Sequence, residues 1–362
     1  MARGWPRGRV PGLDGVRALA VLVVLVAHVQ TGFAHRLSVA GSVGVAVFFA
    51  LSGFLITRIL LDRPPLTTFF RDRALRLLPA MLAFVLLAGL VQQVRTGYPL
   101  ARMWPAATYL GNWLSPPGGF THLWSLAVEE QFYLVWPVLI VSVRRWRLGP
   151  VLLCSAGLAA SLMVKLALWD GGHGAVRLYF GSDTQAWALL CGCLLASLMH
   201  LGLRTRAVPG LGLAAVAALL VAAWLPGNPV STALVAPVVA PVGTAVVIWG
   251  ACGSSDRLLG HPALRWVGRR SYSLYLWHPF ALGIGADVLG TGVAGAVTGL
   301  ILAGLAAELS WQLVETPFLR LKGRRTATAT AVVRAPQAAA VVVRDPGTVD
   351  ELGVGRSYVG AA

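Results

Sequence analysis

Charged residues are scarce in this sequence. They make up 12% of the 362 residues, whereas roughly 25% is usual in soluble domains. Apolar residues make up 57%, and the mean hydropathy is +0.71. A chain with so little polar surface cannot cover a globule folded in water, so a soluble enzyme is close to excluded.

Cysteine is also rare, with four residues in the chain. Cys154, Cys191, Cys193 and Cys252 lie in or beside apolar runs. The Cys191-x-Cys193 pair has no histidine or second cysteine pair at a zinc-like spacing. We therefore expect neither a disulfide nor a metal site.

Acidic residues are few as well. There are 14 of them against 30 basic residues, which gives a net charge of +16 and an isoelectric point near 11.0. Such a balance is typical of nucleic-acid-binding proteins, but it also arises in membrane proteins, whose cytoplasmic loops are rich in arginine and lysine. The position of the charges along the chain decides between the two.

Long apolar runs are what the sequence has in abundance. A membrane-spanning helix needs about 20 mostly apolar residues, and ten stretches qualify: 13–32, 42–61, 79–94, 126–143, 150–169, 184–201, 210–225, 231–252, 271–289 and 292–314. The first is not a cleaved signal peptide, because it carries Asp14, Arg17 and His28 and lacks a small-residue cleavage site.

Basic residues gather in every second loop between these stretches. The N-terminus, the loops after the second, fourth, sixth and eighth stretches, and the end of the chain are basic, while the alternate loops hold only Arg36, Arg95, Arg102 and Arg177. This alternation matches the positive-inside rule for ten crossings. It predicts an all-α, polytopic membrane bundle of about ten helices with both termini in the cytoplasm. The basic excess is then a topology signal, and we expect no nucleic-acid partner.

The sequence divides into two parts. Residues 1–320 form the predicted transmembrane domain, and residues 321–362 are a low-complexity tail without a helical period. We expect that tail to be a disordered cytoplasmic extension.

Ionisable residues inside membrane spans are costly and mark candidate functional sites. Arg17 and His28 are eleven residues apart, about three helical turns, so they share one face of the first span. His28 is expected in the outer half of the membrane and Arg17 near the cytoplasm, where Asp14 can pair with it. The alternative is that His28 is an interior histidine bonded to a neighbouring helix.

Two further clusters stand out. Arg73 and Arg76 are one turn apart, and with Arg71 they form either a phosphate clamp on a short interfacial helix or a topology signal that contacts lipid head groups. Two adjacent carboxylates, Glu129 and Glu130, lie at the outer end of another span.

Together with His28, the carboxylates supply the two kinds of group that a general acid–base pair needs. Glu129 shares a helical face with Ser125 and Tyr133, and Glu130 points about 100° away. Both are expected on the same side of the membrane as His28, where a carboxylate orients an imidazole. The alternative is that the two glutamates only contact interfacial water.

Six motifs resemble those of the acyltransferase 3 family of integral membrane O-acyltransferases. In order they are LDGVRALA (13–20) with His28, FFALSGFLI (48–56), RxRxxRxxP (71–79), WSLxxEEQFY (124–133), SYSLYLWH (271–278) and ETP (315–317). In FFALSGFLI, Ser52-Gly53 lets another helix approach closely. In SYSLYLWH, His278 is expected in the cytoplasmic half of its span.

The resemblance implies transfer of an acyl group, often acetyl, from acyl-CoA to a hydroxyl of a carbohydrate or glycosylated acceptor at the plasma membrane. The chain is expected to be a stand-alone type, without the fused esterase-like domain of some members. Whether a separate extracytoplasmic partner protein completes transfer stays an open alternative.

Family and residues together give one mechanistic hypothesis. Acyl-CoA binds from the cytoplasm, with its phosphates at Arg71, Arg73 and Arg76 and with Arg17 along its path. His28, oriented by Glu129 or Glu130, removes the proton of the acceptor hydroxyl, or else forms a covalent acyl intermediate. The remaining polar residues expected to bind substrate are Asp14, Ser125, Tyr133 and His278. The rival function is a non-enzymatic membrane carrier or exporter of a polar or lipid-linked molecule.

Overall fold

The computed structural model describes most of the chain up to Leu321. The described residues form helices and turns with no strand among them, so the predicted all-α fold is confirmed. They are 10–29, 38–114, 119–169, 175–204, 216–219, 221, 236–253 and 258–321.

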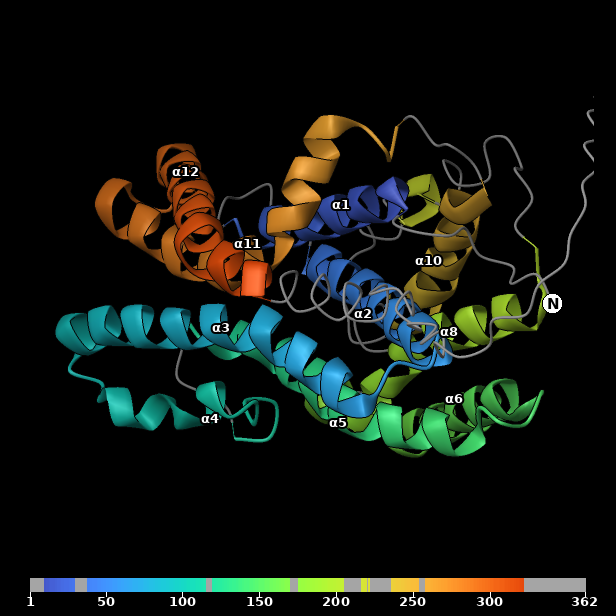
Figure 1. The fold of residues 1–362 in the computed structure, drawn as a ribbon. Coiled ribbons are helices and arrows are strands. Elements are labelled where there is room, and N and C mark those ends of the chain that lie inside the picture. Colours follow the sequence, from blue (N-terminus) through green and yellow to red (C-terminus); the bar gives the residue numbers. More distant parts are fainter. Residues whose placement is uncertain are drawn as a thin grey trace, which may run out of the picture. The chain divides into compact units, whose positions relative to one another are not determined.

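Helices follow one another along the chain with short connections (Figure 1). They are α1 (Pro11–His28), α2 (Ser38–Leu61), α3 (Leu66–Thr96), η2 (Leu100–Met103), α4 (Trp104–Ala107), η3 (Thr121–Leu123), α5 (Trp124–Val143), α6 (Gly149–Ala167), α7 (Ala175–Phe180), α8 (Ser182–Leu201), α10 (Ala236–Gly253), α11 (Pro262–Leu289), α12 (Val293–Ser310) and η5 (Trp311–Glu315).

Seven helices in the described part are long and apolar enough to cross a membrane, as expected of a multi-pass membrane protein. They are α1, α2, α3, α5, α6, α8 and α12 with its continuation. α10 is apolar but shorter, and α11 is 28 residues long.

Seven of the predicted spans fall on these seven helices, and the spans 231–252 and 271–289 fall on α10 and α11. The tenth span is 210–225, most of which lies outside the described residues, as do residues 1–9 and 322–362. The total of ten crossings and the cytoplasmic termini stay predictions.

α3 corrects one expectation. The sequence predicts a short interfacial helix with Arg71, Arg73 and Arg76, followed by a separate span from Pro79. The structure instead has one helix of 31 residues that continues through Pro79. Proline removes only one backbone hydrogen bond, whereas a helix end inside a bilayer leaves several backbone groups unsatisfied. The arginines therefore belong to the spanning helix itself.

A close helix crossing joins α2 to α8. A Cβ atom on Gly53 would lie 1.9 Å from the carbonyl oxygen of Leu189, and one on Gly192 would lie 1.8 Å from that of Ala50. Only glycine permits this approach, so the close contact predicted at Ser52-Gly53 is confirmed. α2 also contacts α1, α5 and α10, and it is therefore the most enclosed of the spanning helices.

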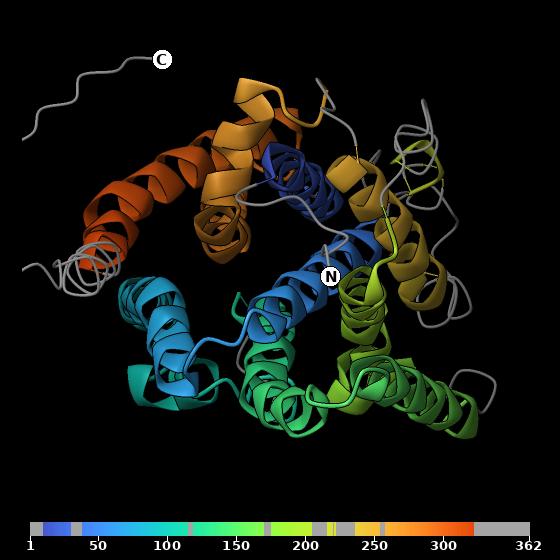
Figure 2. The same ribbon diagram turned by 45° about the vertical axis from the view of Figure 1, so that its right-hand side comes forward.

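α1 is held between α2 and α11 (Figure 2). A Cβ atom on Gly268 of α11 would lie 1.9 Å from the carbonyl oxygen of Asp14. This second glycine contact fixes α1 at the level of Arg17, which is half-buried.

Candidate active site

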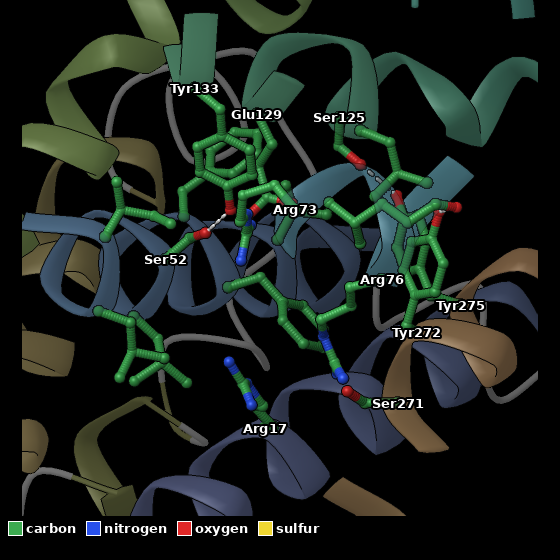
Figure 3. A pocket seen from close by; sticks show the side chains of 18 residues that line it. Arg17, Ser52, Arg73, Arg76, Ser125, Glu129, Tyr133, Ser271, Tyr272 and Tyr275 are labelled. Carbon is green, nitrogen blue, oxygen red and sulfur yellow. Dashed lines mark hydrogen bonds between the residues drawn. The ribbon is translucent and has the colours of Figure 1, made fainter. Parts of the chain in front are cut away.

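Five helices line a cavity with about 730 Å³ of empty space, part of it open to the surroundings. α1, α2, α3, α5 and α11 each contribute polar side chains (Figure 3). These are Arg17, Ser52, Arg73, Arg76, Ser125, Glu129, Tyr133, Ser271, Tyr272 and Tyr275.

Three arginines from two helices meet at this cavity. Arg17 comes from α1, and Arg73 and Arg76 come from consecutive turns of α3. They are close enough for Arg17 to be repelled by both others, and Asp14, 3.9 Å from Arg17, offsets part of that repulsion. Asp14 itself is buried and does not line the cavity. The concentration of positive charge fits an anionic ligand.

Arg71 is not part of the group of arginines at the cavity. Its guanidinium pairs with Asp72 at 3.0 Å, and it does not line the cavity. Residues 73 and 76 share a face of α3, whereas residues 71 and 73 lie about 200° apart around the helix. The predicted arginine group is thus divided by the helix itself.

A small polar network faces Arg73. The central carbon of its guanidinium lies 4.0 Å from the centre of the Tyr133 ring, and the hydroxyl of Tyr133 donates to Glu129 Oε1 at 3.3 Å. Ser52 of α2 is hydrogen-bonded to the same hydroxyl. Glu130 is half-buried and attracts Arg73 but does not line the cavity.

Ser125, Glu129 and Tyr133 all line the cavity. The prediction that they share one face of α5 is therefore confirmed. Their depth differs from the expectation. Glu129 lies near Arg17, which is three turns from His28, about 16 Å along α1. α5 follows the buried turn η3 and so begins inside the bundle. Its carboxylates therefore lie deeper than a count from the membrane edge suggests.

His28 lies at the last residue of α1 with an exposed side chain. Its Nδ1 is 2.8 Å from the carbonyl oxygen of Val24. Its ring packs edge-on against His278, with centroids 4.8 Å apart. Within the described residues no contact joins His28 to Glu129 or Glu130, so the structure brings it to another histidine and not to the predicted carboxylates.

The position of His278 is a further correction. The sequence places it in the cytoplasmic half of its span, yet it lies beside His28 and is fully buried. α11 begins at Pro262, so His278 is sixteen residues, about 24 Å, from the helix start. Arg265 and Arg269, which the charge pattern assigns to a loop, are part of this helix.

Tyr275 connects the cavity with the histidines. Its side chain lines the cavity, and its hydroxyl lies 2.6 Å from Ser125 Oγ and donates to the carbonyl oxygen of His122 at 2.9 Å. Its ring lies 5.5 Å from that of His278, centre to centre. Tyr275 thus contacts both the cavity and the ring that packs on His28.

Several polar residues at or near the site escape sequence reasoning. Tyr272 and Tyr275 are one turn apart, which could have marked a polar face of α11. Glu315 is 1% exposed, is hydrogen-bonded to Ser273 and is an attractive charge for Arg76. It lies in the π-helical turn η5, a feature that often accompanies functional sites.

The cysteines take no part in the cavity. All four are free and buried. In the part of the chain that the structure describes, no group of three or more histidine, cysteine, aspartate or glutamate residues is arranged to hold a metal ion.

Comparison with known proteins adds independent information. The acyltransferase domain family model matches residues 10–310. The peptidoglycan O-acetyltransferase OatA of Listeria monocytogenes is 29% identical over 86% of this chain and 56% of the relative. The putative peptidoglycan O-acetyltransferase YrhL of Bacillus subtilis is 31% identical over 88% of this chain and 56% of the relative.

The chain thus spans little more than half the length of these curated relatives. No solved structure matches it. The matched region contains all five helices that line the cavity, and the chain belongs to the acyltransferase domain family.

Proposed function

We propose that this protein is a membrane-embedded O-acyltransferase that moves an acyl group, acetyl in the first instance, from acyl-CoA to a hydroxyl of a carbohydrate or glycosylated acceptor. One observation carries the proposal. A single cavity, in a chain that belongs to the acyltransferase domain family, combines three arginines with a carboxylate and three tyrosines, one of which, Tyr133, packs against Arg73.

The arginines suit the donor. CoA carries phosphates, and guanidinium groups bind phosphate through paired, charge-assisted hydrogen bonds. Arg73 and Arg76 lie on the part of α3 that the charge pattern assigns to the cytoplasmic side, where acyl-CoA is available. Arg17 extends the positive surface along α1. Glu129 and Glu130 attract Arg73 and offset part of this charge.

His28 suits the acid–base role. A carbonyl oxygen only accepts hydrogen bonds, so the short contact with Val24 places the hydrogen of a neutral His28 on Nδ1 and leaves Nε2 basic. In the proposed step Nε2 takes the proton of the acceptor hydroxyl while its oxygen attacks the thioester carbonyl. A C–O bond forms, the C–S bond breaks, and the departing thiolate takes the proton back from the imidazolium.

The acceptor class rests on the relatives, which are named for peptidoglycan O-acetylation. A cell-surface carbohydrate would place this protein in the plasma membrane. Ser125 and Tyr133 line the cavity, Asp14 lies 3.9 Å from Arg17, and His278 packs on His28. In this proposal all four contribute to substrate binding.

Acceptor-dependent release of CoA from acetyl-CoA tests the proposal. The purified chain in lipid nanodiscs is incubated with acetyl-CoA and a peptidoglycan oligosaccharide, and the product is identified by mass spectrometry. We expect transfer in the wild type, loss of at least about a hundredfold in His28→Ala, and unchanged transfer in the control His261→Ala, which is exposed at the start of α11. Wild-type turnover in His28→Ala would contradict the assignment, and a carrier would release no CoA.

A further inference from the structure

Trp113 is an exposed tryptophan outside the cavity. It lies in the turns that follow α4 and is 53% exposed. Its indole Nε1 donates to Gln131 Oε1 of α5 at 3.4 Å, and the central guanidinium carbon of Arg177 lies 5.3 Å from the centre of its ring. The ring is therefore held by two neighbours while much of its surface stays accessible.

Gln131 fixes the segment that carries Trp113. Its Nε2 donates to the carbonyl oxygen of Tyr109 and to Asn112 Oδ1, both at 2.9 Å. Its Oε1 accepts from Ser182 at 2.6 Å as well as from Trp113. These contacts use both donor hydrogens and both lone pairs of the amide. The ring of Trp113 is thus presented in a fixed position, where little ordering of the protein opposes contact with a ligand.

The charged neighbours of Trp113 indicate that this surface faces water. Arg177 Nη1 and Nη2 donate to Asp183 Oδ1 and Oδ2 at 2.7 and 2.6 Å, and the two side chains are 39% and 42% exposed. Exposed ionised groups are costly in hydrocarbon, so the ring beside them lies in an aqueous setting. The charge pattern assigns Arg102 and Arg177 to outer loops, which predicts that this surface is on the outer side of the membrane.

Tyr109 connects the same segment with the cavity. Its hydroxyl lies near Tyr272, which lines the cavity, and near the carboxylate of Glu130. That hydroxyl is buried and has no hydrogen-bond partner among the described residues. The Cα atoms of Tyr109 and Trp113 are at most about 14 Å apart, because four residues cannot span more. An oligosaccharide of a few sugar rings is long enough to cover this distance.

The groups on this surface match the chemistry of a sugar ring. A sugar ring has an apolar face of C–H groups and a rim of hydroxyls, which both donate and accept hydrogen bonds. The face of an aromatic ring is partly negative and attracts the weakly positive C–H groups. A guanidinium has more N–H donors than the two that Arg177 gives to Asp183, and a carboxylate has further lone pairs, so the pair retains both kinds of group for hydroxyls.

We infer that the exposed ring of Trp113 binds a sugar ring of the carbohydrate acceptor by stacking, and that Arg177 and Asp183 bind hydroxyls of the same sugar. The ligand class rests on the proposed function, since the relatives are named for peptidoglycan O-acetylation. Trp113 holds the acceptor next to the cavity and takes no part in proton transfer. Its substitution should therefore weaken acceptor binding without slowing the reaction of the bound acceptor.

Two substitutions separate stacking from support of the loop. Trp113→Phe and Trp113→Leu both lose the N–H group that bonds to Gln131, but only Trp113→Phe keeps an aromatic face. Trp146→Leu is the matched control. Trp146 is 55% exposed and has the guanidinium carbon of Arg145 4.8 Å from its ring centre, but it follows α5 on the side that the charge pattern assigns to the cytoplasm.

Binding is measured without acetyl-CoA, so that no transfer takes place. A peptidoglycan oligosaccharide is titrated into each protein in nanodiscs, and saturation-transfer NMR gives the Kd. We expect the Kd to rise about threefold to tenfold in Trp113→Leu, the range for one aromatic contact, and clearly less in Trp113→Phe. Trp146→Leu should bind like the wild type. Equal Kd values in the wild type and Trp113→Leu, or equal losses in the two Trp113 variants, would overturn the inference.

Transfer kinetics give a second readout. The KM for the oligosaccharide should rise in parallel with the Kd in Trp113→Leu, while kcat stays within about twofold. A loss confined to kcat would contradict a binding role. The expected Kd differences without any acetyl transfer by the wild type would count against the proposed function alone. Normal transfer with unchanged acceptor binding in Trp113→Leu would instead remove the sugar site and leave the proposed function intact.

Discussion

The guanidinium of Arg73 lies over the ring of Tyr133, 4.0 Å from its centre. The hydroxyl of that tyrosine donates to Glu129, and Ser52 is bonded to the same hydroxyl. An aromatic face attracts a cation, and the nearby carboxylates Glu129 and Glu130 attract it as well. The cavity therefore holds Arg73 in place through contacts within the protein.

Substitution of Tyr133 tests the contribution of this ring. Tyr133→Leu removes both the ring face and the hydroxyl, whereas Tyr133→Phe removes only the hydroxyl. A cation–π contact is worth about 0.5–2 kcal/mol, so we expect the KM for acetyl-CoA to rise about threefold to thirtyfold in Tyr133→Leu and far less in Tyr133→Phe. Steady-state transfer kinetics measure both values. Equal KM values in the two variants would show that the ring face does not support donor binding.

Arg71 and Arg73 provide a matched pair on one helix. Arg73 lines the cavity and Arg71 pairs with Asp72 outside it. A charge-assisted hydrogen bond contributes about 1.5–3 kcal/mol, so the Kd for CoA should rise about tenfold to hundredfold in Arg73→Ala. In Arg71→Ala it should stay within about threefold. Calorimetric titration of the purified variants with CoA measures the difference, and a larger effect at Arg71 would contradict the assignment of the cavity.

The glycine crossing of α2 and α8 predicts a stability effect. Gly192→Ala places a methyl group 1.8 Å from a backbone oxygen that cannot move without its helix. Overpacking of this kind costs about 1–3 kcal/mol. We expect the Tm in detergent to fall by several degrees. The control is Gly283→Ala on α11, where a Cβ atom meets nothing within 4 Å, and its Tm should stay the same or rise.

The predicted topology can be tested by labelling, because all four native cysteines are buried. Thr96 and Arg147 are exposed at the ends of α3 and after α5. In intact cells a membrane-impermeant maleimide should label Thr96→Cys, whereas Arg147→Cys should react only after permeabilisation. The opposite pattern would invert the proposed orientation.

Local relationships in the site could be predicted from the sequence. The shared face of Ser125, Glu129 and Tyr133 depends only on the helical period, and so does the pairing of Arg73 with Arg76. Ser52-Gly53 likewise predicts a close helix contact, because small residues let two helix backbones approach each other. Each of these is a statement about residues within one helix.

Depth in the membrane could not be predicted in the same way. The charge pattern assigns clusters of arginines to loops, yet the arginines at 71–76 and 265–270 lie within the helices α3 and α11. α11 therefore starts earlier in the sequence than the charge pattern suggests, so His278 lies farther along its helix. Glu129 lies deeper for a different reason, because α5 starts at the buried turn η3. The contact between His28 and His278 could not be predicted either, for a different reason. His278 is 250 positions away, and only the packing of α1 against α11 brings the two rings together.

Because α3 is one continuous helix, the positions of Arg73 and Arg76 are fixed by the packing of α3 against α11. The helix is attached to α11 at two levels, since Tyr272 donates to the carbonyl oxygen of Leu77 at 2.9 Å and Arg95 pairs with Asp287 near the other end. Arg73 and Arg76 therefore lie on a single continuous helix about 46 Å long that is attached to α11 at two positions, and not on a mobile loop. A donor would meet a preorganised phosphate site, in which little ordering of the protein opposes binding.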